Sequence, residues 1–227
     1  MSNSNLGLNR KVIKVLVDSL SDSDSKIYKD IMSITGESSG EVDENDTLIN
    51  YLTDGTEVTT LTSNAVKKVA DNVFNGYNEL VTVNFPKATS IGVRSFQGCT
   101  SLNTVDFTSA KSLGNYAFKE CSSLRNVTIP NVETIGEYAF ADCKSLRSIV
   151  LPKVTFIGDR AFTGCYLLNK LILSGSTIVE LANDYGIVFN ALPDIFVPDN
   201  LVDLYKNDTI WGDVATRIKP LSQLPTE

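Results

Sequence analysis

The residues of this chain best suited to do chemistry are its four cysteines, Cys99, Cys121, Cys143 and Cys165, which follow one another at intervals of 22 residues. Cysteine can bind zinc, act as a nucleophile or oxidise to a disulfide. Zinc sites usually contain a close C-x₂-C pair, which this even spacing lacks. A disulfide would need neighbouring Cα atoms within about 7 Å. We expect four free thiols that fill a core, because cysteine is among the most buried residue types.

Other chemistry has little support in the sequence. The chain contains no histidine, which excludes His-based acid–base catalysis and the Ser-His-Asp and Cys-His nucleophiles. The carboxylates form no convergent pair of the glycosidase kind. A net charge of −7 argues against nucleic-acid binding, and no apolar run approaches the ~20 residues of a membrane span. We therefore predict a protein that is not an enzyme, needs no cofactor or metal, and binds neither nucleic acid nor membrane.

The cysteines belong to a longer repeat with the same step. One unit runs from Leu124 to Ser145 with the pattern L-x-x-V-x-I-P-x-V-x-x-I-G-x-x-A-F-x-x-C-x-S. Phenylalanine, glycine and a small residue recur with each cysteine. They are Phe96, Phe118, Phe140 and Phe162; Gly92, Gly114, Gly136 and Gly158; and Ser95, Ala117, Ala139 and Ala161. An internal period of this length is typical of solenoid proteins.

Each part of the unit predicts a local structure. The alternation in L-x-x-V-x-I predicts a short strand with one buried face, and the following proline ends its hydrogen bonding. The spacing of I-G-x-x-A-F-x-x-C predicts a return leg with one turn of helix or 3₁₀ helix. The glycine is expected at a tight corner with an unusual backbone conformation. Stacked turns would bury the Leu, Phe, Ile and Cys columns as one continuous core.

The motif I-G-x-x-A-F-x-x-C-x-x-L-x-x-V-x-L-P resembles the BspA-type leucine-rich repeat, from about Leu61 to Leu173. The tail from Ile195 through Trp211 to Leu221 resembles the C-terminal cap common in that family. The resemblance implies an α+β leucine-rich-repeat solenoid with a strand-helix C-terminal cap. The family occurs on bacterial cell surfaces, in some protists and in proteins of phages and prophages. It implies binding or scaffolding and supplies no catalytic residues.

The regions around the repeats divide the chain into five parts. We predict a helical attachment or oligomerisation segment (1–35), an acidic linker (36–47), an N-terminal hairpin and worn capping repeat (48–79), leucine-rich repeats (80–173) and a C-terminal cap (174–227). Asp54-Gly55 is the expected turn of a hairpin from Leu48 to Leu61. In the C-terminal cap, Asp199 is the expected N-cap of a helix, and Trp211 is the expected packing anchor.

The first 35 residues carry two apolar stripes at helical spacing. The stripes form a candidate attachment face: Val12, Ile13, Leu16, Val17 and Leu20, then Ile27, Tyr28, Ile31 and Met32. Helices this short are marginal alone, so they need a partner. The two helices pack on each other, on another copy or on a partner protein, or else they dock against the N-terminal end of the solenoid itself.

A second candidate surface is the outer face of the predicted strands. Side chains between the buried positions point outward. These candidate binding residues are Thr82, Asn84, Thr104, Asp106, Asn126, Thr128, Ser148, Val150, Lys170, Ile172 and Phe196. Their hydroxyl and amide groups suit a glycan or a protein ligand, and the same groups would also serve merely to keep a strand face soluble.

Three functional hypotheses fit these features. The first is a virion component of a tailed phage, such as a head fibre, decoration protein or tail-associated adhesin, made in the host cytoplasm. It would join other virion proteins through the N-terminus as a homo-oligomer, with a trimer favoured, and display the solenoid to a host surface protein or glycan. The second is an adhesin on a bacterial cell surface, and the third is an intracellular scaffold. The N-terminus lacks the basic stretch and apolar core of a signal peptide, which favours the first.

Overall fold

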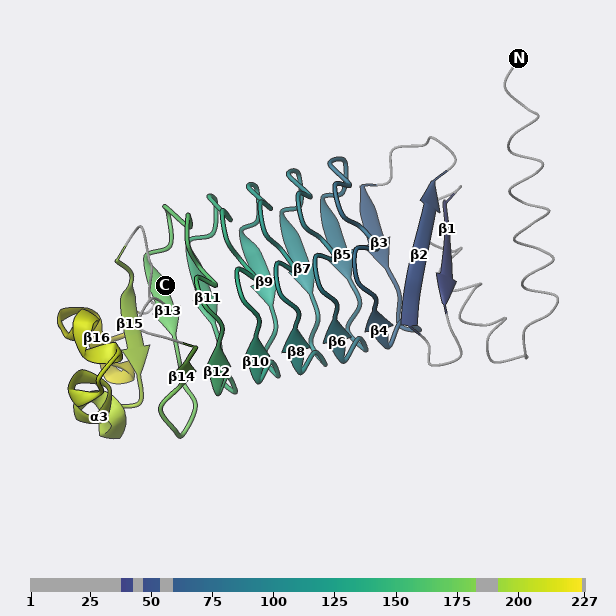
Figure 1. Cartoon of the computed structure of the whole chain (residues 1–227). Helices are drawn as coiled ribbons and strands as arrows, with labels where there is room; N and C mark the ends of the chain where they lie inside the picture. The colour runs from purple at the N-terminus through teal and green to yellow at the C-terminus, as the bar shows by residue number, and fades with distance from the viewer. Residues whose placement is uncertain (1–37, 43–46, 54–58, 183–191, 226–227) are drawn as a thin grey trace, which may run out of the picture.

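The computed structural model describes residues 38–42, 47–53, 59–182 and 192–225. It shows a solenoid, with successive turns stacked side by side along one axis (Figure 1). Each turn contributes one short strand to each of two sides, and the strands of successive turns pair in parallel everywhere except at one place on one side. The partners are 22 residues apart, as in Thr82↔Thr104 and Ser90↔Ser112, so the structure confirms the predicted solenoid and its period.

The two sides of the solenoid carry strands of different lengths. On one side, two-residue strands follow one another: β4 (Lys68–Val69), β6 (Ser90–Ile91), β8 (Ser112–Leu113), β10 (Thr134–Ile135), β12 (Phe156–Ile157) and β14 (Glu180–Leu181). On the other side lie β3 (Thr60–Thr62), β5 (Thr82–Asn84), β7 (Thr104–Asp106), β9 (Asn126–Thr128), β11 (Ser148–Val150), β13 (Lys170–Ile172), β15 (Asp194–Val197) and β16 (Ile218–Pro220). In most of these strands buried residues alternate with more exposed ones, so one face of the strand points toward the core.

The core lies between the two sides and consists of columns of equivalent residues. The rings of Phe74, Phe96, Phe118, Phe140 and Phe162 form one stack, with neighbouring centroids 5.0–5.4 Å apart and ring planes within 12° of parallel. The cysteines form a second column and are fully buried. The columns confirm the predicted ladders. Their geometry follows from the parallel register, which places each residue directly beside its equivalent in the next turn.

The return leg differs from the expected helical turn. After each two-residue strand the chain makes consecutive tight turns, closed by bonds such as Cys99 N to Phe96 O (3.2 Å). A non-glycine residue with positive φ interrupts any helical run at the same place in each turn: Asn72, Arg94, Tyr116, Tyr138 and Arg160, with φ between 50° and 62°. The helical turn predicted from the spacing of apolar residues is therefore wrong. Successive tight turns can also place these residues on the side that faces the core, as a helix would.

The repeated glycine serves close packing rather than an unusual backbone conformation. A Cβ atom at Gly114 would lie 2.6 Å from the carbonyl carbon of Gly92, which is closer than real Cβ contacts come. Gly114 is absent from the residues with positive φ, and the left-handed position lies two residues later, at Tyr116. The glycine therefore allows the backbones of neighbouring turns to approach one another, which corrects the expected reason for its presence.

The N-terminal end has a hairpin, but not the predicted one. Strand β1 (Ser38–Val42) pairs antiparallel with β2 (Thr47–Thr53), so a strand lies within the segment expected to be a linker. Strand β2 then pairs in parallel with β4, and Leu48 is the partner of Val69. The strand near Leu61 belongs to the opposite sheet. Strands β2 and β3 therefore belong to two different sheets rather than to one hairpin, and the expected turn at Asp54-Gly55 lies outside the described residues.

The C-terminal cap combines strands and short helices, as predicted. Strand β15 pairs with β13 and β16, and three helical segments surround them: η1 (Asp199–Leu201), α3 (Val202–Asn207) and η2 (Trp211–Arg217), with η3 (Leu221–Gln223) after β16. Asp199 does not cap the helix. Its carboxylate accepts a hydrogen bond from Ser222 N–H (3.1 Å) and ties the helical segment to the last turn of the chain.

Candidate functional site

The outer surface of the three-residue strands carries the candidate binding residues. Within β5, β7, β9, β11 and β13, the first and third residues are exposed or half-buried, while the middle residue faces the core. Ten of the predicted residues therefore lie on one surface, as expected from the alternation of side chains along a strand. Val150 is the most exposed apolar member, at 48%.

Phe196 does not belong to this surface. It is 2% exposed, so its inclusion among the candidate binding residues was wrong. The alternation rule fails here because three successive residues of β15 are buried, in the part of the chain where the C-terminal cap begins. Lys219 is its partner on the neighbouring strand β16, so the row of outward positions ends under the cap.

Polar side chains bond with one another along this surface. The amide of Asn126 donates to the hydroxyl of Thr104 on the previous turn (3.2 Å), and that hydroxyl donates to Asn103 Oδ1 (3.2 Å). Asp106 accepts two hydrogen bonds from Thr108, including one from its backbone N–H at 3.1 Å. These contacts hold the polar side chains of β7 and β9 in place. The resulting polar surface is suited to hydrogen bonding with a ligand.

The cysteines play no part in a reactive site. Each thiol donates to a phenylalanine carbonyl, as from Cys121 Sγ to Phe96 O (3.1 Å), and all four are free. Burial raises the pKa of Cys99 and Cys165 to about 12, and raises the pKa of Cys121 and Cys143 well above the ordinary value. A thiol that stays protonated is a poor nucleophile and a poor metal ligand. The thiols therefore act as core residues, as predicted.

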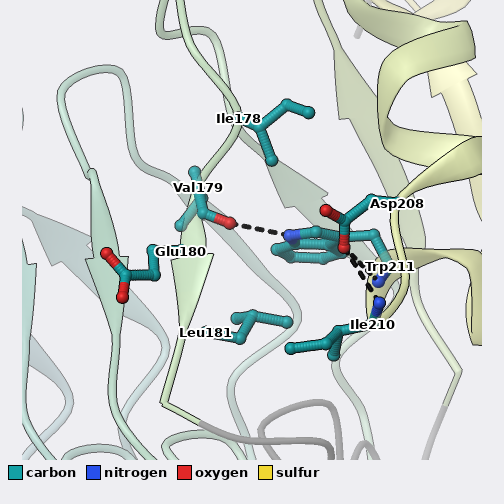
Figure 2. Close-up of a pocket in the computed structure, with 7 residues that line it drawn as sticks. All are labelled: Ile178, Val179, Glu180, Leu181, Asp208, Ile210 and Trp211. Atoms are coloured by element: carbon teal, nitrogen blue, oxygen red, sulfur yellow. Dashed lines mark hydrogen bonds between the residues drawn. The ribbon is translucent and has the colours of Figure 1, made fainter.

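A hollow of about 270 Å³ lies where the last solenoid turn meets the C-terminal cap. Figure 2 shows Ile178, Val179, Glu180 and Leu181 on the solenoid side and Asp208, Ile210 and Trp211 on the cap side. The indole of Trp211 lies between them and donates to Val179 O (2.7 Å), while Asp208 accepts the N–H groups of Ile210 and Trp211.

These contacts make the hollow a joint between two parts of the fold. Trp211 is 1% exposed and stacks edge-on against Tyr205, whose hydroxyl accepts a hydrogen bond from Val179 N–H. Trp211 is thus the packing anchor that the sequence predicted. The lining supplies two carboxylates and no cationic or nucleophilic group, so it does not assemble a catalytic constellation.

The candidate attachment face, Val12 to Met32, lies outside the described residues. Among the residues that the structure describes, no group of three or more Cys, Asp and Glu side chains could hold a metal ion. Within the same ranges no helix is long and apolar enough to cross a membrane.

Stacked parallel turns with leucine, phenylalanine and cysteine columns define a leucine-rich-repeat solenoid, a fold typical of protein-interaction scaffolds. The family model described as "BspA type Leucine rich repeat region" matches residues 50–204 in 6 copies, so the chain belongs to this family. The match confirms the resemblance seen in the repeat motif. A search of curated proteins gives no match.

Solved structures of bacterial proteins share the fold. A leucine-rich-repeat protein of T. pallidum is 27% identical, with a TM-score of 0.54, covering 59% of this chain and 67% of that protein. One from Bacteroides ovatus is 26% identical, with a TM-score of 0.53, covering 72% of this chain and 42% of the other. A leucine-rich cell surface protein of Faecalibacterium prausnitzii is 22% identical, with a TM-score of 0.52, covering 82% and 53%. This chain therefore spans about half or less of the last two proteins.

Proposed function

We propose that this protein is a non-enzymatic recognition protein that presents the outer surface of its three-residue strands to a protein or glycan on a host cell. The observation that carries this proposal is the row of outward-facing polar side chains contributed by consecutive turns, half-buried on β5 and β7 and exposed on β9. The core columns use the cysteines and most aromatic residues, which leaves this surface as the extended region able to make repeated contacts.

We further propose that the carrier is the virion of a tailed phage, as a head fibre, decoration protein or tail-associated adhesin. Residues 1–35 would attach a homo-oligomer, with a trimer favoured, to other virion proteins. The sequence supports this arrangement through the two apolar stripes that precede the repeats, since short helices of this kind need a partner. The occurrence of the repeat family in phages is also consistent with it.

A bacterial cell surface is the alternative carrier. The Faecalibacterium prausnitzii protein is a leucine-rich cell surface protein, although a sequence identity of 22% supports only a shared fold. Genes beside this one distinguish the two carriers. Capsid and tail genes would support the virion, and a secretion locus would support the cell surface.

The recognition role is tested by blocking the strand surface with bulk. The double variant N126W/T128W places bulky uncharged side chains on β9, where both residues are exposed. The matched control T134W/T155W adds the same bulk at two exposed positions on the other side of the solenoid. We expect the fluorescently labelled full chain to bind host cells at least tenfold less after N126W/T128W and normally after T134W/T155W. Equal binding by both variants would contradict recognition through β9.

Attachment through the N-terminus is tested by removing it. Deletion of residues 1–35 should leave a folded solenoid that no longer self-associates or sediments with virions. The variant Leu16→Asp should act similarly, because a charge within a buried apolar stripe is costly unless it is paired. Analytical ultracentrifugation and co-sedimentation measure both effects. A truncated chain that forms the same oligomer would show that association runs through the solenoid instead.

A further inference from the structure

The outer sheet of the solenoid is interrupted at one place, between β9 and β11. These strands occupy equivalent positions in consecutive turns, yet β9 ends the sheet β3-β5-β7-β9 and β11 begins the sheet β11-β13-β15-β16 (Figure 1). On the opposite side β10 pairs with β12 in regular register. In the core, the rings of Phe118 and Phe140, which precede β9 and β11 in the chain, stack with centroids 5.4 Å apart. The interruption is therefore confined to the outer surface, and we call it the seam.

The seam leaves backbone donors, and the Arg125 carbonyl that would accept from them, without these protein partners. In the neighbouring turns two N–H groups converge on one carbonyl, as when Asn169 and Lys170 donate to Arg147 O (2.9 and 3.3 Å). The equivalent bonds from Arg147 and Ser148 to Arg125 O are missing within residues 59–182, and the N–H of Arg147 has no other backbone acceptor there. Buried or half-buried N–H groups normally find a partner, so an unpaired one at the surface is available to a ligand.

Burial changes at the same place. The middle residues of the other outer strands are buried, including Val105 at 0% and Ile149 at 2%. Val127, the middle residue of β9, is only half-buried. On the β9 side of the seam the middle residue is thus more exposed than its equivalents, whereas on the β11 side Ile149 remains buried.

Two arginines lie directly beside the seam. Arg125 and Arg147 precede β9 and β11 at equivalent positions, and both are exposed. Neither forms an ion pair with a carboxylate in the described part of the chain. They occupy equivalent positions in consecutive turns, so their two like charges repel one another. An anion between the guanidinium groups would remove this repulsion.

The surroundings strengthen the positive charge. The outer segments 101–106, 123–128, 145–150 and 167–172 contain three cations, Arg125, Arg147 and Lys170, against one acid, Asp106. Asp106 is hydrogen-bonded to Thr108. Exposed Lys144 precedes the second arginine by three residues. Within these four segments cations outnumber acids in a chain whose net charge is −7, although Asp194 on β15 is the register partner of Lys170.

We propose that the seam is a binding site for an oxyanion group carried by an anionic polysaccharide. Arg125 and Arg147 each offer a planar fork of donors that matches a phosphate, sulfate or carboxylate, and the free N–H of Arg147 adds a further donor. The proposal rests on the proposed recognition function and names the class of its ligand. The polymer lies across the outer strands, with one anionic group at the seam and hydroxyl groups beside the polar residues of β7 and β9.

The test compares two double variants of the full chain. R125Q/R147Q removes the seam cations, and the matched control K87Q/K153Q removes two exposed cations beyond the other end of the outer strands. The probes are heparin for sulfate, polygalacturonate for carboxylate and phosphomannan for phosphate, with neutral dextran as the blank. We expect binding of at least one charged probe at low ionic strength, weakened at least tenfold by R125Q/R147Q and less than twofold by K87Q/K153Q. R125K/R147K, which keeps the charges but not the forks, should give an intermediate loss.

The outcomes separate this site from the wider function. Equal weakening by both glutamine variants, or no binding of any charged probe by the wild-type chain, would overturn the site. Melting temperatures unchanged by the substitutions establish that the fold is retained. If host-cell binding is lost in N126W/T128W while R125Q/R147Q keeps both host-cell binding and polysaccharide affinity, recognition by the strand surface holds and the seam site is wrong. If only the polysaccharide affinity responds, the seam site holds and the cell-recognition role is wrong.

Discussion

Among single residues, Ser95 is an exception within a column of alanines. It is fully buried, its hydroxyl has no hydrogen-bond partner, and the equivalent residues are Ala117, Ala139 and Ala161. We expect Ser95→Ala to raise the free energy of unfolding by about 1 kcal/mol, because an unsatisfied buried hydroxyl is costly. The reciprocal control Ala117→Ser should lower it by a similar amount. Urea denaturation measures both, and a loss of stability in Ser95→Ala would contradict this account.

The cysteine column predicts a specific alkaline instability. Burial raises the pKa of Cys99 and Cys165 from 9.0 to about 12, and it raises the pKa of Cys143 well above 9.0. Unfolded thiols lose protons near pH 9 while folded thiols keep them, so their stabilising contribution is complete below pH 9 and is lost toward pH 12. Unfolding free energy should therefore fall over this window. Cys143→Ala should make the fall shallower by up to about 1.4 kcal/mol per pH unit, the limit for one proton.

The same thiols can be counted chemically. Alkylation without reductant should modify four cysteines in denatured protein and leave them largely unmodified in native protein at neutral pH, because a buried protonated thiol reacts slowly. Mass spectrometry distinguishes the two states. Recovery of two disulfides from the denatured protein would contradict the free-thiol assignment and would favour an exported protein.

At the scale of one turn, the repeated glycine sets how closely backbones approach. Gly114→Ala would place a Cβ 2.6 Å from the backbone of Gly92, whereas Gly76, at φ +79°, has open space around it. We expect Gly114→Ala to lower the free energy of unfolding by about 3 kcal/mol, since backbone atoms cannot move aside as a side chain can. Gly76→Ala should cost about 1 kcal/mol from its left-handed conformation. Thermal unfolding of both variants measures the difference, and equal effects would contradict the packing role.

At the scale of the whole molecule, each turn contacts mainly its neighbours, so stability is roughly a sum over turns. Deleting residues 112–133 joins Lys111 to Thr134 and removes one 22-residue period, which keeps every column in register. We expect this chain to remain folded with a lower melting temperature. Deleting residues 112–122 removes half a period and should prevent cooperative folding. Circular dichroism melts compare them, and similar behaviour of the two deletions would contradict the register argument.

Much of this architecture could be predicted from residue types alone. The period of 22, the phenylalanine and cysteine columns and the outward positions of the middle strands all follow from which side chains are apolar. Trp211 was identified as an anchor for the same reason. Buried positions can be recognised in the sequence because each turn must contribute an apolar residue to every core column.

Backbone geometry was predicted less well. The sequence pattern favoured helical return legs and a repeated glycine with an unusual backbone conformation, yet the positive φ values fall at residues such as Tyr116. A repeated apolar spacing indicates which side chains share a side, but it does not distinguish a helix from successive tight turns. Pairing of β1 with β2 was missed for a related reason, since main-chain hydrogen bonds can join strands with little apolar patterning.

The sequence by itself determined that this chain forms a stacked solenoid with a buried thiol column and no histidine-based chemistry. Only the tertiary structure decided that Phe196 is buried and that the outer sheet is interrupted between β9 and β11. The segments Asn126–Thr128 and Ser148–Val150 follow the same repeat pattern as their paired neighbours. Whether two such strands pair depends on their spacing within the assembled stack. The backbone groups that form those bonds are the same in every residue except proline.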